Sequence, residues 1–354
     1  MKIYVIAYIN KNLGDDIFLN ILCERYKDHI FYLDEIAKYL KHDNISFYSK
    51  KVYFIESLAL KLMKFFSKSK YDTRIRIINR CDLVITLGGS MFIEKQEFKN
   101  YLMFSKPHYI LGANFGPFLT ENFFDKSREY FSLAKDVCFR DTYSYELFKK
   151  LKNVRVAPDI IYSFGKLNQI RKNEKKVVLS IIDTYCRFDK VITDRYESTM
   201  IKLIKNLQEL KYNIVLMSFC KNEGDEEAIE IIFNSLLSKD NVKKFYYDGN
   251  VEEAIEELSS SSIIFGSRFH ANIIGLSLGC TIIPLAYSDK TINALKDAGY
   301  ENRIFDIRES NFIELSKMES LDLNYKLDIS DLESNAEKHF DSLDKVLGKS
   351  NERQ

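Results

Sequence analysis

The sequence predicts an α/β fold made of two Rossmann-like domains. Short apolar runs typical of buried strands alternate with helical patterns through most of the chain, as expected for successive βα units and parallel sheets. The polar stretch 167–176 interrupts this alternation, which resumes after it. With 354 residues, the chain is long enough for two domains of ordinary size.

Each half of the chain shows the same alternation of strand-like runs and amphipathic helical patterns. In the first half we expect strands at residues 3–9, 83–87, 108–111, 136–139 and 154–156, and helices at 16–26, 52–67, 73–80, 121–134 and 142–151. In the second half we expect strands at 177–182, 213–218, 242–246, 262–265, 281–284 and 304–305, and helices at 195–211, 224–237, 251–258, 271–278 and 291–298.

The domain boundaries follow from the polar stretch and from the C-terminal pattern. We expect an N-terminal domain at 1–166, a linker at 167–176 and a C-terminal domain at 177–328. The tail at 329–354 has apolar residues spaced along one helical face, so it is expected to form a helix that packs back across a domain.

The composition is ordinary for a soluble globular protein, with 46% hydrophobic and 29% charged residues. The net charge of +1 provides no overall basic field, so nucleic acid is not an expected partner. The six cysteines form no C-x-x-C pair and match no zinc pattern, so we expect no metal site and a reducing compartment. With no signal peptide and no run of about 18 apolar residues, the expected location is the cytoplasm.

The turn Gly266-Ser267-Arg268-Phe269-His270 is the strongest functional signal. It lies between an expected strand and an expected helix, so Ser267 is predicted to be the N-cap, with Arg268 and His270 in the first turn. Backbone N–H groups and the helix dipole favour an anion there, and an arginine adds a contact to phosphate or carboxylate. Histidine can move protons near neutral pH. The turn therefore combines anion binding with acid–base chemistry.

Two turns in the first half are further candidates, because ligands on such folds bind beyond the carboxyl ends of strands. Asn12, Gly14 and Asp15 follow the first strand, and Asp16 is expected to cap the next helix. Gly88-Gly89-Ser90 follows a later strand and opens backbone N–H groups toward an anion. Neither turn has the P-loop or the G-x-G-x-x-G pattern, so we expect no ATP site of that type and no NAD.

Two cations also follow expected strands. Arg140 is costly to bury without an anionic partner, which is either Asp141 or a substrate. Lys290 begins a helix and is either a surface lysine or a contact to an anion bound at Arg268. Asp141 or Thr142 is expected to cap a helix.

Residues 53–68 form an apolar helical pattern with Lys61, Lys64 and Lys68 on its polar side. The pattern fits either a core helix with one wet face or a helix that docks on a membrane with anionic lipid. His108 lies within an expected strand and is expected to be a core histidine with satisfied hydrogen bonds.

Taken in order, these landmarks resemble those of the polysaccharide pyruvyl transferase family. Its asparagine–glycine–aspartate turn is matched at Asn12 to Asp15, and its glycine-rich turn at Gly88 and Gly89, although Ser90 replaces a usual third glycine. The remaining matches are the glycine–proline loop Gly112 to Phe118, Arg140-Asp141 with Ser144, Pro158-Asp159, the turn Ser267 to His270, and Lys290.

The resemblance implies a glycosyltransferase-B-like fold with the active site in the interdomain cleft. Such enzymes transfer the pyruvyl group of phosphoenolpyruvate to a saccharide, typically as a ketal, and none of their chemistry calls for a metal or a cofactor. The resemblance lends catalytic roles to Arg268 and His270. The expected substrate-binding residues are Asn12, Gly14, Asp15, Gly88, Gly89, Arg140, Ser267 and Lys290.

The expected partners are phosphoenolpyruvate and a saccharide, free or lipid-linked, with a peripheral membrane contact if residues 53–68 dock on lipid. Two alternatives stay open. One is a glycosyltransferase that uses a nucleotide sugar on the same architecture, and the other is an inactive family member that binds a saccharide. Fold by itself does not decide among them.

Overall fold

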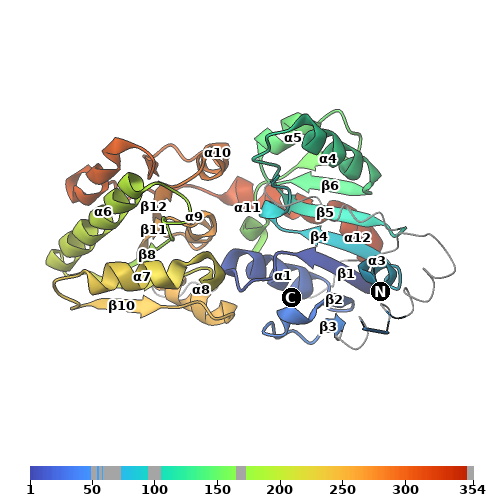
Figure 1. Ribbon diagram of the computed structural model, residues 1–354, viewed down its shortest axis with the longest axis horizontal. Coiled ribbons are helices and arrows are strands. Elements are labelled where there is room, and N and C mark those ends of the chain that lie inside the picture. Colours follow the sequence, from blue (N-terminus) through green and yellow to red (C-terminus); the bar gives the residue numbers. More distant parts are fainter. Residues whose placement is uncertain (49–53, 56–57, 59–72, 95–104, 165–172, 349–354) are drawn as a thin grey trace. The chain divides into compact units, whose positions relative to one another are not determined.

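The computed structural model describes the chain except for residues 49–53, 56–57, 59–72, 95–104, 165–172 and 349–354 (Figure 1). The chain divides into two compact units. Unit 1 contains Met1–Ile9, Phe18–Ile160 and Ala336–Gln354, and unit 2 contains Asn10–Ile17 and Ile161–Asn335. Each unit is an α/β layer structure around a parallel sheet, which confirms the predicted fold class.

Unit 1 contains a seven-stranded sheet in the order β3-β2-β1-β4-β5-β6-β7. Residues of β4 and β5 are buried on both faces, as expected for central strands of a parallel sheet, whose sequences are continuous apolar runs. The strands are β1 (Lys2–Ala7), β2 (Ile30–Asp34), β3 (Ile45–Tyr48), β4 (Leu83–Leu87), β5 (His108–Ala113), β6 (Asp136–Phe139) and β7 (Val154–Val156).

The core of unit 1 includes a cluster of phenylalanines between its sheet and helices, in which Phe115, Phe131 and Phe148 are in mutual contact. The tail returns to this unit, where Arg25 forms ion pairs with Glu337 and Asp344 at 2.8 and 2.6 Å. The described helices are α1 (Leu13–Arg25), of which Leu13–Ile17 belong to unit 2, α3 (Thr73–Ile78), α4 (Glu121–Leu133), α5 (Thr142–Phe148) and α12 (Asp341–Leu347).

Unit 2 contains a six-stranded sheet in the order β10-β9-β8-β11-β12-β13, flanked by helices (Figure 1). All of its strand pairs are parallel, so the carboxyl ends of the strands lie at one edge. The strands are β8 (Asn173–Ser180), β9 (Asn213–Met217), β10 (Val242–Phe245), β11 (Ser261–Gly266), β12 (Thr281–Ala286) and β13 (Phe305–Asp306).

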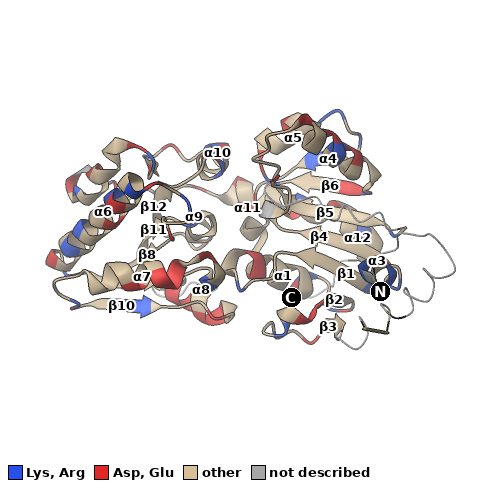
Figure 2. Cartoon of the chain, viewed as in Figure 1, with Lys and Arg blue, Asp and Glu red and all other residues tan. Residues whose placement is uncertain are grey.

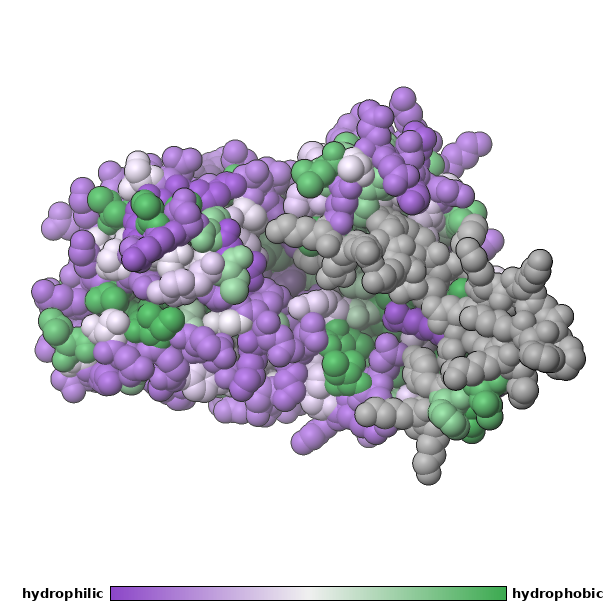
Figure 3. Space-filling view, viewed as in Figure 1, coloured by the Kyte–Doolittle hydropathy of each residue, from purple (hydrophilic) through white to green (hydrophobic). Residues whose placement is uncertain are grey.

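The helices of unit 2 cover an apolar core, and its visible surface is mainly hydrophilic with small separate hydrophobic groups (Figure 3). The long helix α6 buries Met200, Leu203 and Leu207 at the spacing of one helical face. The helices are α6 (Lys190–Glu209), α7 (Asp225–Asn234), α8 (Val251–Ser259), α9 (Phe269–Ser277), α10 (Asp289–Asp297) and α11 (Ser330–Ala336). The first turn of α7 is acidic (Figure 2).

Two strands of unit 1, β2 and β3, are absent from the sequence-based expectation. All four residues of β3 are only half-buried, and it is the edge strand of the sheet, so it lacks the apolar run that marks a central strand. The expected helix at 52–67 lies largely outside the described residues, as do Lys61, Lys64 and Lys68 with the expected membrane contact.

The units divide the chain differently from the expected boundaries at 166, 177 and 329. Unit 2 starts at Ile161 and takes Asn10–Ile17 from the N-terminal region, while Ala336–Gln354 belongs to unit 1. Part of the expected linker 167–176 lies outside the described residues, and its last residues belong to β8. There Lys176 pairs with Glu257 at 2.8 Å, so charged residues are accommodated in the strand.

Among the helices of the described part of the chain, none is both long and apolar enough to cross a lipid bilayer.

Candidate functional site

The strand order of unit 2 defines where a ligand site is expected. Strands β9 and β10 lie on one side of β8, and β11 and β12 on the other, so the order reverses between β8 and β11. Ligands of open α/β sheets bind at such a switch point, beyond the carboxyl ends of the strands. The side chains that follow these strands are Arg187 after β8, Glu223 and Asp225 after β9, Tyr247 after β10, Arg268 and His270 after β11, and Lys290 after β12.

The predicted N-cap is wrong by one residue, because α9 begins at Phe269 and Arg268 is its N-cap, with φ −77° and ψ 138°. Ser267 is fully buried, and its hydroxyl lies 3.1 Å from the hydroxyl of Tyr196. The turn is tied to β8, since the Arg268 N–H donates to Ser180 Oγ at 2.9 Å. Arg268 itself is in extended conformation, and the helix starts after it.

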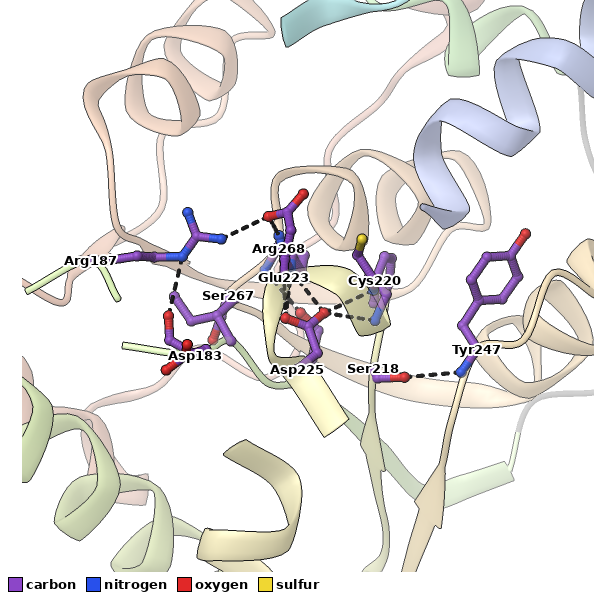
Figure 4. Close-up of polar contacts among 12 residues, drawn as sticks. Asp183, Arg187, Ser218, Cys220, Glu223, Asp225, Tyr247, Ser267 and Arg268 are labelled. Carbon is purple, nitrogen blue, oxygen red and sulfur yellow. Dashed lines mark hydrogen bonds and ion pairs between the residues drawn. The ribbon is translucent and has the colours of Figure 1, made fainter. Parts of the chain in front are cut away.

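The Arg268 side chain is buried and bound by two carboxylates (Figure 4). Its Nε lies 3.1 and 2.9 Å from the two oxygens of Asp225, and Nη2 also donates to Asp225. Its Nη1 donates to Glu223. Burial by itself would lower the pKa of Arg268, but the two carboxylates raise it well above its usual value, so the guanidinium stays charged.

Asp225 is the deeper of the two carboxylates. It is fully buried in the first turn of α7 and also accepts from the backbone N–H groups of Phe219 and Cys220, each at 2.9 Å (Figure 4). Burial raises the pKa of Asp225, and Arg268 opposes that shift. A carboxylate that accepts this many hydrogen bonds anchors Arg268 by geometry as well as by charge.

His270 lies in the first turn of α9 and packs against Gly14. A Cβ at position 14 would overlap the imidazole, so glycine is required for this approach. The ring of Phe269 meets that of His270 edge-on, with centroids 5.0 Å apart. Nζ of Lys290 lies over the Phe269 ring, 5.2 Å from its centroid. The structure thus brings together three of the expected site positions, Gly14, His270 and Lys290.

The Asn12–Asp16 turn belongs to unit 2 and begins α1 earlier than predicted. Asn12 Oδ1 accepts from the Gly14 N–H at 3.2 Å, while Asp15 and Asp16 are buried in the first helical turn. The expected cap role of Asp16 is therefore wrong. Its carboxylate instead accepts a hydrogen bond of 2.7 Å from the hydroxyl of Tyr247.

The remaining expected site residues, Gly88, Gly89 and Arg140, form a second group within unit 1. A Cβ at Gly89 would overlap the Arg140 guanidinium, and Gly88 has a φ of 114°, where glycine is favoured. Arg140 is buried and pairs with Asp159 at 2.8 Å, and its Nη2 donates to Asn114 at 3.1 Å.

Asp159 is therefore an anionic partner of Arg140 that was not expected from the sequence, where Asp141 and a substrate were the two alternatives. Binding of a substrate by Arg140 stays a prediction. Asp141 instead caps α5 by accepting from the Ser144 N–H at 2.7 Å, as one of the two predicted caps. The expectation for His108 is confirmed, since its Nε2 lies 2.8 Å from Thr86 Oγ1 and burial lowers its pKa to about 3.

Sequence reasoning missed four residues of the unit 2 group. They are Arg187, Glu223, Asp225 and Tyr247, and each follows a strand at the carboxyl edge of the sheet. The rule that singled out Arg140, a charged residue after a predicted strand, applies equally to Arg187 and Asp225. Applying that rule to every predicted strand would have found these two residues.

Comparisons with known proteins agree with this architecture. A model of the polysaccharide pyruvyl transferase family matches residues 12–289. The chain is 24% identical over 262 residues to the amylovoran biosynthesis protein AmsJ of Erwinia amylovora, a match that covers 65% of this chain and 63% of that protein. The chain thus spans less than two thirds of the length of this relative.

Similar solved structures are more distant in sequence. Anabaena HepE in complex with UDP and glucose is 10% identical with a TM-score of 0.54, covering 98% of this chain and 96% of that one. S. aureus MnaA with UDP is 12% identical with a TM-score of 0.56, covering 100% and 98%. The UDP-GlcNAc 2-epimerase of Methanocaldococcus jannaschii with UDP-GlcNAc and UDP is 10% identical with a TM-score of 0.56, covering 98% and 99%. These similarities show the fold, which is of the GT-B type.

Proposed function

Because the chain belongs to the polysaccharide pyruvyl transferase family, we propose that it transfers the pyruvyl group of phosphoenolpyruvate to a saccharide and forms a pyruvate ketal in polysaccharide biosynthesis. The acceptor is a free or lipid-linked saccharide. The observation that carries the proposal is the placement of Arg268 and His270 at the start of α9, beyond the carboxyl end of β11. This is the position where a ligand of such a sheet binds.

The charges of unit 2 suit an anionic donor. Phosphoenolpyruvate carries a phosphate and a carboxylate, and each needs cationic or N–H-rich partners. Arg268 and Lys290 both follow strands at the carboxyl edge of the sheet, and the N-terminus of α9 adds backbone N–H groups. In this proposal these groups bind the donor and stabilise the phosphate as it leaves.

His270 is the residue to which we assign proton transfer. In ketal formation, two sugar hydroxyls bond to C2 of the enolpyruvyl group. The oxygen of one hydroxyl bonds to C2 while a proton adds to C3, which turns the methylene into a methyl group. The oxygen of the other hydroxyl then displaces the phosphate from C2. The two hydroxyl protons end on C3 and on the phosphate, so a group that both accepts and donates protons is required. Histidine is suited to this role near neutral pH.

The test is direct. The purified chain is incubated with phosphoenolpyruvate and with galactoside, mannoside or N-acetylhexosamine acceptors, with and without EDTA, and phosphate release is followed. We expect release that depends on the acceptor and withstands EDTA, together with a product heavier by one pyruvyl group. Release of a nucleotide from a nucleotide sugar, with none of phosphate from phosphoenolpyruvate, would support the glycosyltransferase alternative instead.

A further inference from the structure

Two arginines of unit 2 meet at one carboxylate. Arg187 Nη2 lies 2.7 Å from Oε2 of Glu223, and Arg268 Nη1 donates to the same oxygen (Figure 4). Two guanidinium groups that converge on one carboxylate oxygen form an arrangement that is also suited to an oxygen of a phosphate or another carboxylate.

The two carboxylates on Arg268 differ in how firmly they are held. The Asp225 side chain is 0% exposed and has backbone donors of its own, whereas that of Glu223 is 25% exposed, and the partners described for it are the two arginine side chains. Glu223 ends the short turn Lys221–Glu223, so its side chain can turn toward solvent without disturbing a long helix. Asp225 is thus a fixed partner of Arg268, and Glu223 an exchangeable one.

Local backbone and side-chain contacts fix the position of Arg187 near Glu223. Gly224 adopts a left-handed φ of 82°, and a Cβ there would lie 2.8 Å from Cβ of Asp183, so this glycine allows the two loops to touch. The carbonyl of Asp183 accepts from Arg187 Nε at 3.1 Å. The Arg187 guanidinium also lies over the ring of Tyr287, with Cζ 5.1 Å from its centroid. Arg187 is therefore oriented from both sides.

The location of the pair agrees with a ligand site. Arg187 follows β8 and Arg268 follows β11, the two strands that flank the switch point of the sheet. Burial alone would raise the pKa of Glu223, but Arg268 and Arg187 lower it below its usual value, so the carboxyl is charged and acts as an anion between them.

We propose that Arg187 is a further anion-binding residue, and that Glu223 occupies the position between Arg187 and Arg268 where the phosphate or carboxylate of the donor binds. The inference rests on the proposed function for the identity of that donor. When the donor binds, its anionic group replaces Glu223, which turns toward solvent, while Asp225 keeps Arg268 in place.

The experiment measures dissociation constants by titration calorimetry, with inorganic phosphate and phosphoenolpyruvate as separate probes. Glu223→Gln removes the competing charge and is expected to tighten both ligands about fivefold. Arg187→Gln removes a donor and is expected to weaken both about tenfold. The matched controls Glu314→Gln and Arg303→Gln change the net charge equally at an exposed ion pair of the same unit, and should leave both constants unchanged.

The outcomes separate this inference from the proposed function. If the variants shift phosphate binding as expected but phosphoenolpyruvate is not turned over, the proposed function fails and the anion position stands. The inference is overturned if phosphoenolpyruvate is turned over while Glu223→Gln binds phosphate and phosphoenolpyruvate no more tightly than the wild type does. It is also overturned if phosphoenolpyruvate is turned over while Arg187→Gln binds them no more weakly than the wild type does. Absence of phosphate binding in both the wild type and Glu223→Gln would overturn it as well. Circular dichroism of each variant verifies that it is folded.

Discussion

The imidazole of His270 lies in the space that a side chain at position 14 would fill. The two residues are distant in sequence, yet Gly14 and His270 both belong to unit 2, since Asn10–Ile17 packs with the C-terminal half of the chain. The glycine of the first turn is therefore needed for the placement of the histidine, which gives a physical reason for a glycine at this point.

Gly14→Ala is expected to displace His270 and to lower turnover at least about tenfold, because His270 transfers protons in the proposed reaction and small misplacements of such a group are costly. The measurement is kcat for phosphate release. In a His270→Ala background the same substitution should cost nothing more, since no imidazole remains to be displaced. Equal losses in both backgrounds would mean that Gly14 acts independently of His270.

His270→Ala is expected to lower kcat roughly 100-fold or more, the usual scale for loss of a general acid or base. The dissociation constant for phosphoenolpyruvate should change little, because the cationic residues are intact. His42→Ala, which removes a histidine that contacts Asn20 in unit 1, serves as the control and should retain full turnover. Normal turnover by the His270 variant would move the proton transfer to another residue.

Asp225→Asn is expected to destabilise the fold, because it leaves the buried Arg268 charge without its main partner. Loss of one member of a buried ion pair typically costs about 3 kcal/mol or more in free energy of unfolding. Urea unfolding followed by circular dichroism measures this loss. Glu230→Gln, at the ion pair with Lys244 on the surface, should change stability little. Similar stability of both variants would contradict an anchoring role for Asp225.

The residues predicted from sequence are those whose setting is local. Arg268 and His270 were recognisable because a strand pattern, a turn and a helix pattern adjoin them, and Asp141 because a cap lies next to its helix. The contacts that define the site are not local. Arg268 is 43 residues from Asp225, and Tyr247 is 231 residues from Asp16. Such pairs follow from the order of strands in the sheet, which periodicity does not specify.

Because periodicity does not specify such distant pairs, the sequence does not predict the partners of Arg268 that the structure shows. From sequence it is a cation at a helix terminus, ready to bind an anion. In the folded chain the cost of burying its charge is met by Asp225 and Glu223, so its guanidinium is already paired with carboxylates of the protein. The division of the chain is likewise non-local, since Asn10–Ile17 and the tail join units that their sequence positions do not indicate.

His339 leads to the last prediction, which concerns stability and pH. It lies in the tail, fully buried, with Nε2 2.7 Å from the carbonyl of Pro158, the residue before Asp159. Its Nδ1 is buried without a hydrogen-bond partner. Burial lowers the pKa of His339 to about 3, because the charged ring would lose its hydration.

An unfolded histidine titrates near pH 6.5, so between about pH 6.5 and 3 the unfolded chain binds a proton that folded His339 does not. The free energy of unfolding must then fall as the pH is lowered through this range, by about 2 kcal/mol per such histidine between pH 7 and pH 5. His339→Gln, which retains a donor for Pro158, should flatten this dependence by about that amount in urea unfolding at pH 5, 6 and 7. His108→Gln should do the same, since His108 is buried with a similarly lowered pKa. A slope unchanged in both variants would show that neither ring stays neutral in the folded protein.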